Sequence, residues 1–304
     1  MPFVLKKYTV EKKQKAFLFF VRELALSQKE AQRYIAKGRL FQNGIAITNS
    51  TTPIEGEVEF VTFEPASRGL KPIYDEKDFV VFDKPSGVLI HPQGRHTPYS
   101  IVDELRYQYG KEANITHRLD QETSGVVLCA KTKQSEIDIK ELFQNRTIQK
   151  SYLAMVYGRF PDKLDVDAPL LRVKEASLNI KNLVEVNPNG KSSFTSFACK
   201  EYFPELNMSL IEAKPHTGRQ HQIRVHLFHV KHPIVGDPIY GQDEIDIIKF
   251  LDKEITPQYR IEKSGASRLL LHASELEFEL YNKKYHIKSK IDFEKICFES
   301  MCNI

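Results

Sequence analysis

The chain has 304 residues, of which 41% are hydrophobic. This length is greater than that of a usual single compact domain. We therefore expect two units, one of them small. The formal net charge is only +4, but residues 1–50 hold ten basic and three acidic side chains, a net charge of +7 that leaves −3 for the remainder. A segment of this kind indicates contact with a nucleic acid or another anionic surface.

Membrane and disulfide-rich proteins are not indicated. No apolar run approaches the roughly 18–20 residues of a membrane span, and the N-terminus does not resemble a signal peptide, so we expect a cytoplasmic protein. The cysteines are scattered, without a Cys-x-x-Cys spacing, which argues against a structural zinc site and a disulfide framework. They are Cys129, Cys199, Cys297 and Cys302.

The first predicted element is a short helix at residues 15–24. Its apolar side chains recur at helical spacing and would form one buried face. These are Phe17, Phe20, Val21 and Leu24. A second helix follows, because Ser27 and Glu30 have the spacing of a capping box and Gly38 can end the helix. Short strands are predicted next, at residues 40–41, 45–47 and 57–63, with an Asn43-Gly44 turn after the first.

The second helix carries Lys29, Arg33 and Lys37 in one stripe, while Ala31 and Ile35 face the other way. Such a stripe is often only a solvated face. Here, however, it lies in the +7 segment, and the order of elements over about residues 9–64 resembles the alpha-L RNA-binding module. The resemblance implies that Lys29, Arg33, Lys37 and Arg39 contact RNA phosphates.

A linker is predicted at residues 65–72, from the composition Pro-Ala-Ser-Arg-Gly-Leu-Lys-Pro. It divides a small domain at residues 1–64 from a larger one at residues 73–304. The larger domain begins with a buried strand at residues 79–82 and a turn at residues 85–87.

A polar loop precedes the next predicted strand, at residues 126–130. It contains Arg118, Asp120, Thr123, Ser124 and Gly125. Functional groups are often placed at such edges of rigid elements. The alternative is that Asp120 simply accepts hydrogen bonds from backbone amides in a turn.

Five of the ten histidines lie in residues 214–241, which raises the hypothesis of a metal site. They are His216, His221, His226, His229 and His232. A His-Glu-x-x-His spacing is absent from this segment, and Arg219 and Arg224 would repel a dication. The two arginines instead suit phosphate oxygens or a buried carboxylate.

Several motifs, in this order, resemble those of the RluA family of pseudouridine synthases over residues 73–275. They are Asp83-Lys-Pro-Ser-Gly, His117-Arg-Leu-Asp-x-x-Thr-Ser-Gly125, Lys150-Ser-Tyr-Leu-Ala-Met-Val-Tyr-Gly158, Thr217-Gly-Arg-x-His-Gln-Ile-Arg-Val-His226, His232-Pro-Ile-Val-Gly-Asp-Pro-Ile-Tyr-Gly241 and Arg268-Leu-Leu-Leu-His-Ala273. The resemblance implies an α+β fold in which a mixed, mostly antiparallel sheet has flanking helices and a central cleft. Two features depart from the family: Lys231 stands where glycine is common, and the tail after Glu275 lacks a proline-rich pattern.

The resemblance also implies roles for individual residues. Asp120 would be the essential carboxylate, Arg224 its basic partner, and Tyr152 the ring that stacks on the target base and assists removal of its proton. Arg118 would fill the gap left by the flipped uridine. Six further residues would order the site: His117, Thr123, Ser124, Gly125, Arg219 and His221.

The implied reaction is the isomerisation of uridine to pseudouridine, which needs no cofactor or metal. We expect a monomer that acts on RNA, with large-subunit ribosomal RNA ahead of transfer RNA. Asp120 could attack the sugar or remove a proton from it, and the sequence leaves both routes open. Two other classes are a non-catalytic RNA-binding protein and a metal-dependent hydrolase that uses the histidine-rich segment.

Overall fold

A computed structural model describes residues 2–94, 96–173 and 183–301, and Cys302 lies outside them. The chain divides into two compact units. The first comprises residues 1–68 and 92–107, and the second residues 69–91 and 108–304. The chain passes from the first unit to the second after residue 68 and again after residue 107, within helix α3 (Ile101–Tyr109). Among the described residues, no helix is long and apolar enough to span a membrane.

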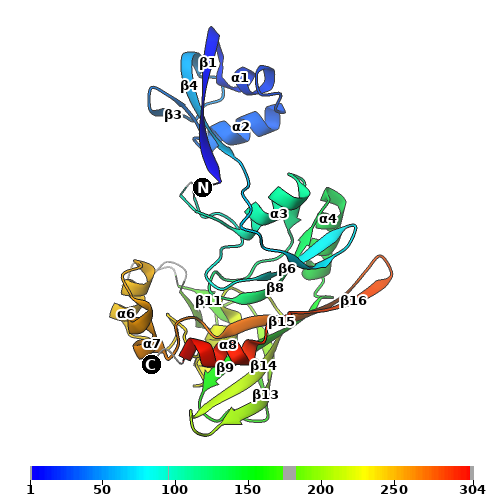
Figure 1. Ribbon diagram of the computed structural model, residues 1–304, viewed down its shortest axis with the longest axis vertical. Helices are drawn as coiled ribbons and strands as arrows, with labels where there is room; N and C mark the ends of the chain where they lie inside the picture. The colour runs from blue at the N-terminus through cyan, green and yellow to red at the C-terminus, as the bar shows by residue number, and fades with distance from the viewer. Residues whose placement is uncertain (1, 95, 174–182, 302–304) are drawn as a thin grey trace. The chain divides into compact units, whose positions relative to one another are not determined.

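Besides most of α3, the described part of the first unit contains a four-stranded antiparallel sheet in the order β1-β4-β2-β3 and the helices α1 and α2 (Figure 1). Its elements are β1 (Phe3–Lys15), α1 (Ala16–Arg22), α2 (Gln28–Ala36), β2 (Leu40–Gln42), β3 (Ile45–Ile47) and β4 (Pro53–Phe63). Both predicted helices and all three predicted strands are therefore confirmed. The capping box is confirmed too, because the Ser27 hydroxyl accepts from the Glu30 amide and the Glu30 carboxylate accepts from the Ser27 amide.

The predicted buried face of α1 is partly wrong. Phe19 and Phe20 are fully buried, whereas Phe17, Val21 and Leu24 are only partly buried. The Phe19 ring packs against a tyrosine of β1, and the Phe20 ring packs edge-on against a phenylalanine of β4. Because this short helix packs against two strands at once, adjacent positions are buried instead of a single stripe.

Strand β1 has no counterpart among the predicted elements. It pairs with β4 from Phe3 opposite Phe63 to Lys15 opposite Pro53. It lies at the edge of the sheet, and most of its side chains are exposed and polar. Charged side chains protect an edge strand from pairing with other chains, but they also remove the apolar alternation by which a strand is recognised.

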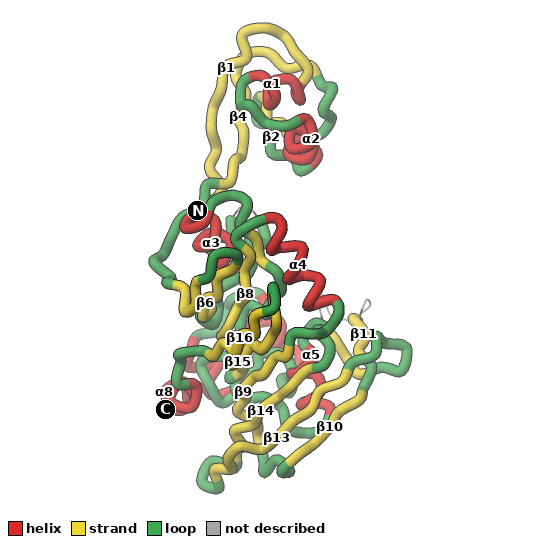
Figure 2. The backbone as a smooth tube through the Cα atoms, turned by 90° about the vertical axis from the view of Figure 1, so that its right-hand side faces the viewer, coloured by secondary structure: helices red, strands yellow, loops and turns green. Residues whose placement is uncertain are grey.

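The second unit is built on a ten-stranded sheet. Its strands are β5 (Pro72–Asp75), β6 (Phe79–Lys84), β7 (Asn114–Ile115), β8 (Ser124–Ala130), β9 (Gln149–Tyr157), β10 (Lys163–Asp167), β13 (Phe194–Phe203), β14 (Met208–Pro215), β15 (Leu271–Leu280) and β16 (Lys283–Lys288). The main order is β10-β13-β14-β9-β15-β8-β6-β5, and Figure 2 shows β10, β13, β14, β9 and β15 side by side. Only the pair β15–β8 is parallel among the strands described. The expected mostly antiparallel α+β fold is confirmed.

The remaining elements of this unit are a two-stranded sheet and five helices. They are β11 (Leu170–Arg172), β12 (Val184–Val186), α4 (Lys133–Gln144), α5 (Gln222–His229), α6 (Glu244–Leu251), α7 (Pro257–Ser264) and α8 (Phe293–Met301). The tail after Glu275 continues β15, turns into β16 and ends in α8, which lies along the sheet in Figure 1. Phe293 and Cys297 of α8 join the core formed by β9 and β14. Lys231 adopts φ 69°, the left-handed conformation that favours glycine.

Candidate active site

The loop before β8 is held close to β15 at one glycine. Gly125 has φ 112°, and a Cβ atom there would lie 2.1 Å from the carbonyl oxygen of Ala273. Glycine is required at this position, because any side chain would separate the only described parallel strand pair. The chain N-terminal to Gly125 is thereby fixed over the centre of the sheet, and it carries Asp120.

The Asp83-Lys-Pro-Ser-Gly motif holds the same loop from β6. The fully buried Lys84 ammonium donates to the carbonyl oxygens of Pro85, Val88 and Gln121 at 2.8–2.9 Å. Burial lowers the pKa of Lys84 to about 7. The Gly87 amide donates to the same Gln121 carbonyl at 2.9 Å. The motif was predicted only to form a turn, and its contacts join that turn to the residue after Asp120.

Three predicted ordering residues lie around the loop. The Thr123 amide donates to the Asp120 carbonyl at 3.2 Å. The buried Ser124 hydroxyl accepts from Arg268 at 2.6 Å and lies 2.9 Å from Nδ1 of His272. His117 Nε2 accepts from a β8 amide at 2.9 Å, and burial lowers the pKa of His117 to about 3. His117 is therefore neutral at physiological pH, as an acceptor for that amide must be.

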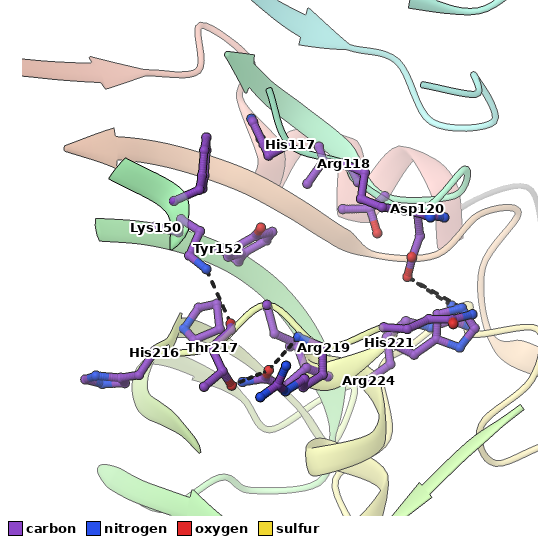
Figure 3. Close-up of a pocket in the computed structure, with 18 of the residues that line it drawn as sticks. His117, Arg118, Asp120, Lys150, Tyr152, His216, Thr217, Arg219, His221 and Arg224 are labelled. Atoms are coloured by element: carbon purple, nitrogen blue, oxygen red, sulfur yellow. Dashed lines mark hydrogen bonds and ion pairs between the residues drawn. The ribbon is translucent and has the colours of Figure 1, made fainter. Parts of the chain in front are cut away.

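The histidine-rich segment, residues 214–241, supplies the cation that faces Asp120. Arg224 lies in α5, its side chain is 3% exposed, and its Nη1 is 3.4 Å from Oδ2 of Asp120 (Figure 3). Its stronger partner is Asp237, which accepts from Nε at 2.7 Å and Nη2 at 2.8 Å. Burial alone would lower the pKa of Arg224, but the charges of Asp237 and Asp120 raise it above its ordinary value. The guanidinium thus stays charged beside both carboxylates.

Asp237 was missed as a site residue, although it lies within one of the family-like motifs. It also accepts from the amides of Ile239 and Tyr240, at 2.9 and 3.0 Å. The Arg224 guanidinium lies over the Tyr240 ring, 5.0 Å from its centroid. Asp237 therefore fixes both the cation that faces Asp120 and the tyrosine beneath that cation.

Tyr152 lies on β9 in the middle of the sheet, opposite Ala213 of β14 and Ala273 of β15. Figure 3 shows its ring on the same side of the sheet as Asp120. Burial, followed by the negative charge of Asp120, raises the pKa of Tyr152. The phenol is therefore protonated at neutral pH and offers a flat, neutral face beside a charged carboxylate.

These residues line a pocket of about 510 Å³ in the second unit. The predicted residues that line it are His117, Arg118, Asp120, Thr123, Tyr152, Arg219, His221 and Arg224. Ser124 and Gly125 support the loop from outside the lining. Arg146 and Lys150 line it as well, and neither was assigned a role, although Lys150 lies two residues before Tyr152 on the same strand.

Charge is unequally distributed in this pocket. Asp120 is the one carboxylate among its described lining residues, and its side chain is 24% exposed. The Lys150 ammonium donates to the Thr217 carbonyl at 3.3 Å, and burial followed by the charge of Arg146 lowers the pKa of Lys150 to about 8. A cation-rich pocket with one accessible carboxylate and the aromatic rings of Phe143 and Tyr152 suits an anionic ligand that carries a planar base.

The histidine-rich segment does not gather into a metal site in the described part of the chain. His226 is instead buried between the hydroxyls of Ser193 and Thr195, at 2.9 Å from each. The one group of described residues with suitable ligand spacing is Glu275, Glu277 and His286, on the β15–β16 hairpin.

The predicted RNA-contacting residues belong to the first unit. Lys29, Arg33 and Lys37 are exposed on α2, opposite the buried Ala31 and Ile35, as the periodicity predicts. Arg39 is partly buried and lies 5.0 Å from the ring of a β1 phenylalanine.

Comparison with known proteins agrees with this site. The family described as RNA pseudouridylate synthase matches residues 78–229. An uncharacterised RNA pseudouridine synthase of Helicobacter pylori is 39% identical over 290 residues, covering 95% of this chain and 94% of that protein. The ribosomal large subunit pseudouridine synthase C of Buchnera aphidicola is 38% identical over 218 residues, covering 71% and 64%.

A solved structure is similar as well. Human RNA pseudouridylate synthase domain containing 4 shares 25% identity at a TM-score of 0.57, covering 76% of this chain and 92% of that one. The extent of these matches, together with the ordered motifs around the pocket, shows that the chain belongs to the RNA pseudouridylate synthase family, as an isomerase of the RluA type.

Proposed function

We propose that the chain converts specific uridines of large-subunit ribosomal RNA to pseudouridine, with Asp120 as the catalytic carboxylate. The observation that carries this is the pocket itself: its one described carboxylate is accessible, faces Arg224, and shares the cavity with the Tyr152 ring. The choice of ribosomal RNA is supported by the relative named ribosomal large subunit pseudouridine synthase C.

The reaction breaks the bond between C1′ and N1, turns the detached uracil, joins C5 to C1′ and releases the proton from C5. An ionised Asp120 serves it either by attacking C1′ or by removing a proton from the sugar. The Arg224 guanidinium places a positive charge 3.4 Å from Oδ2 of this partly buried carboxylate. Tyr152 stacks on the uracil, and its raised pKa favours this role over that of a phenolate base.

The target base must leave its stack, which costs a few kcal/mol. Arg118 is exposed two residues before Asp120, so its planar guanidinium can fill the vacated place in the RNA. His117, Thr123, Ser124, Gly125, Arg219 and His221 act indirectly, by holding the loops that carry the reacting groups.

We also propose that residues 1–64, which lie within the first unit, are an alpha-L RNA-binding domain, joined by a linker at residues 65–72 to a catalytic domain at residues 73–304. Support comes from the exposed stripe on α2, which presents three cations opposite the buried face of that helix. Such a stripe supplies salt-dependent affinity for phosphates and leaves sequence selection to the pocket.

The test is a map of pseudouridines in total RNA from cells with and without the protein. We expect the loss of a small number of large-subunit ribosomal sites, restored by the wild-type chain and not by Asp120→Asn. Loss of sites confined to transfer RNA would replace the proposed substrate. An unchanged map, or full restoration by Asp120→Asn, would overturn the proposed function.

A further inference from the structure

A chain of hydrogen bonds leads from β12 to His221, which lines the pocket next to Asp120. It starts at the amide of Val184 on β12, passes through the hydroxyl of Tyr240 and ends at the imidazole of His221. His221 is the residue immediately before α5, and its Nε2 lies 3.8 Å from Oδ2 of Asp120. A role for these hydrogen bonds in the reaction rests on the proposed function of Asp120.

The hydrogen bonds determine which nitrogen of His221 carries its proton. A backbone amide can only donate, so the Tyr240 oxygen accepts from Val184 at 3.2 Å. Burial raises the pKa of Tyr240, so the hydroxyl keeps its own proton. The hydroxyl lies 2.9 Å from Nδ1 of His221, and we assign the hydroxyl as the donor and Nδ1 as the acceptor.

His221 is also neutral. Burial, followed by the charge of Arg224, lowers the pKa of His221 to about 4. A neutral imidazole carries one proton, and since Nδ1 accepts, that proton lies on Nε2. The nitrogen nearest Asp120 is therefore a neutral donor and not a second cation.

The arginine and the histidine approach the same oxygen of Asp120. Arg224 Nη1 is 3.4 Å and His221 Nε2 is 3.8 Å from Oδ2. The second distance is longer than a hydrogen bond, and contacts of this kind often shorten when substrate binds. With Oδ2 held by these two groups, Oδ1 is the oxygen left for the substrate.

We propose that His221 is a positioning residue: its Nε2–H, set by the Tyr240 hydroxyl, bonds to Oδ2 of Asp120 and fixes the reactive orientation of the carboxylate. A neutral donor orients the carboxylate without neutralising it. Arg224 supplies a positive charge beside Asp120, and His221 fixes the orientation of its carboxylate.

The first test compares two substitutions of His221 by kinetics on the target RNA. His221→Leu removes the donor, and His221→Gln places an amide N–H near the position of Nε2. We expect kcat to fall about 10- to 100-fold in His221→Leu, as for the loss of a hydrogen bond to a charged group, with KM within about twofold of wild type. His221→Gln should recover most of that loss. His229→Leu, at an exposed position of the same helix, is the matched control and should be unchanged.

The second test removes the middle group of the hydrogen-bond chain, the Tyr240 hydroxyl. Tyr240→Phe keeps the ring under Arg224 but removes the hydroxyl, so kcat should fall several-fold. Nitrogen-15 spectra of histidine-labelled wild-type protein should show His221 as the Nε2–H tautomer at pH 7. This measurement does not depend on activity, so it tests the proposal even if His221→Leu fails to fold.

Three outcomes would overturn the proposal: wild-type kcat in His221→Leu, a folded His221→Gln as slow as His221→Leu, or an Nδ1–H tautomer in the spectra. Asp120→Asn is measured alongside. If Asp120→Asn is inactive while His221→Leu is fully active, only the positioning role fails. If Asp120→Asn is active, the proposed function of Asp120 fails instead.

Discussion

Removal of the Asp237 carboxylate should leave the buried Arg224 guanidinium without its main ion-pair partner. Asp237 accepts two hydrogen bonds from Arg224 and two from backbone amides, at 2.7–3.0 Å. The two side chains are only 3% and 1% exposed, so water cannot replace the lost partner. Breaking one side of such a pair costs about 3–5 kcal/mol. We expect Asp237→Ala to lower the free energy of unfolding by about this amount, as measured by urea denaturation.

A double-mutant cycle isolates the ion pair. Arg224→Met combined with Asp237→Ala leaves no unpaired charge from the pair, so the double variant should be more stable than the sum of the single losses predicts, by about 2–3 kcal/mol. Asp237→Asn keeps the size and one acceptor oxygen, and is the milder control. An Asp237→Ala variant within about 1 kcal/mol of wild type, or additive single losses, would refute this reasoning.

Three further predictions concern other parts of the molecule. Gly125→Ala places a Cβ 2.1 Å from a backbone oxygen of β15, so the free energy of unfolding should fall by roughly 3 kcal/mol or more and activity should be lost. Thermal denaturation tests this, and a melting temperature equal to that of wild type would contradict the close approach. Burial lowers the pKa of His272 to about 4, so the unfolded state binds more protons than the folded state between about pH 6.5 and 4. The free energy of unfolding should therefore fall as the pH falls over that range, by up to about 3 kcal/mol from this group. Urea midpoints that do not change between pH 7 and 4.5 would contradict this. A triple variant that replaces the exposed Lys29, Arg33 and Lys37 by glutamine should reduce the slope of log affinity against log salt by roughly 2–3 in RNA-binding titrations. An unchanged slope would show that the stripe is only a solvated face.

Local sequence signals were sufficient where an element depends on its own residues. The capping box at Ser27 fixed the start of α2, and the apolar run at residues 126–130 fixed β8. Strand β1 could not be predicted in this way, because its evident stabilisation is the pairing with β4, which lies far along the chain, and charged side chains interrupt its apolar alternation.

The same distinction applies to the pocket. The motifs placed Asp120 and Arg224 together although they are 104 positions apart, because both had been assigned from a known family. The partners that hold them were not assigned. Asp237, Lys84 and Tyr240 act through contacts with carbonyls, amides and rings that only the folded backbone brings together. Motif resemblance therefore predicted two side chains that meet in the pocket, and the structure adds the residues that hold them.

The most direct measurement is tritium release from large-subunit ribosomal RNA labelled at uridine C5, with purified wild-type protein and Asp120→Asn side by side. Each conversion releases the hydrogen at C5, so the counts report chemistry and not binding. We expect the wild-type protein to release tritium up to the equivalent of a fixed small number of sites. An Asp120→Asn variant that remains folded and binds the same RNA should give only background release. Turnover by Asp120→Asn at a rate near that of wild type would contradict the central role of Asp120.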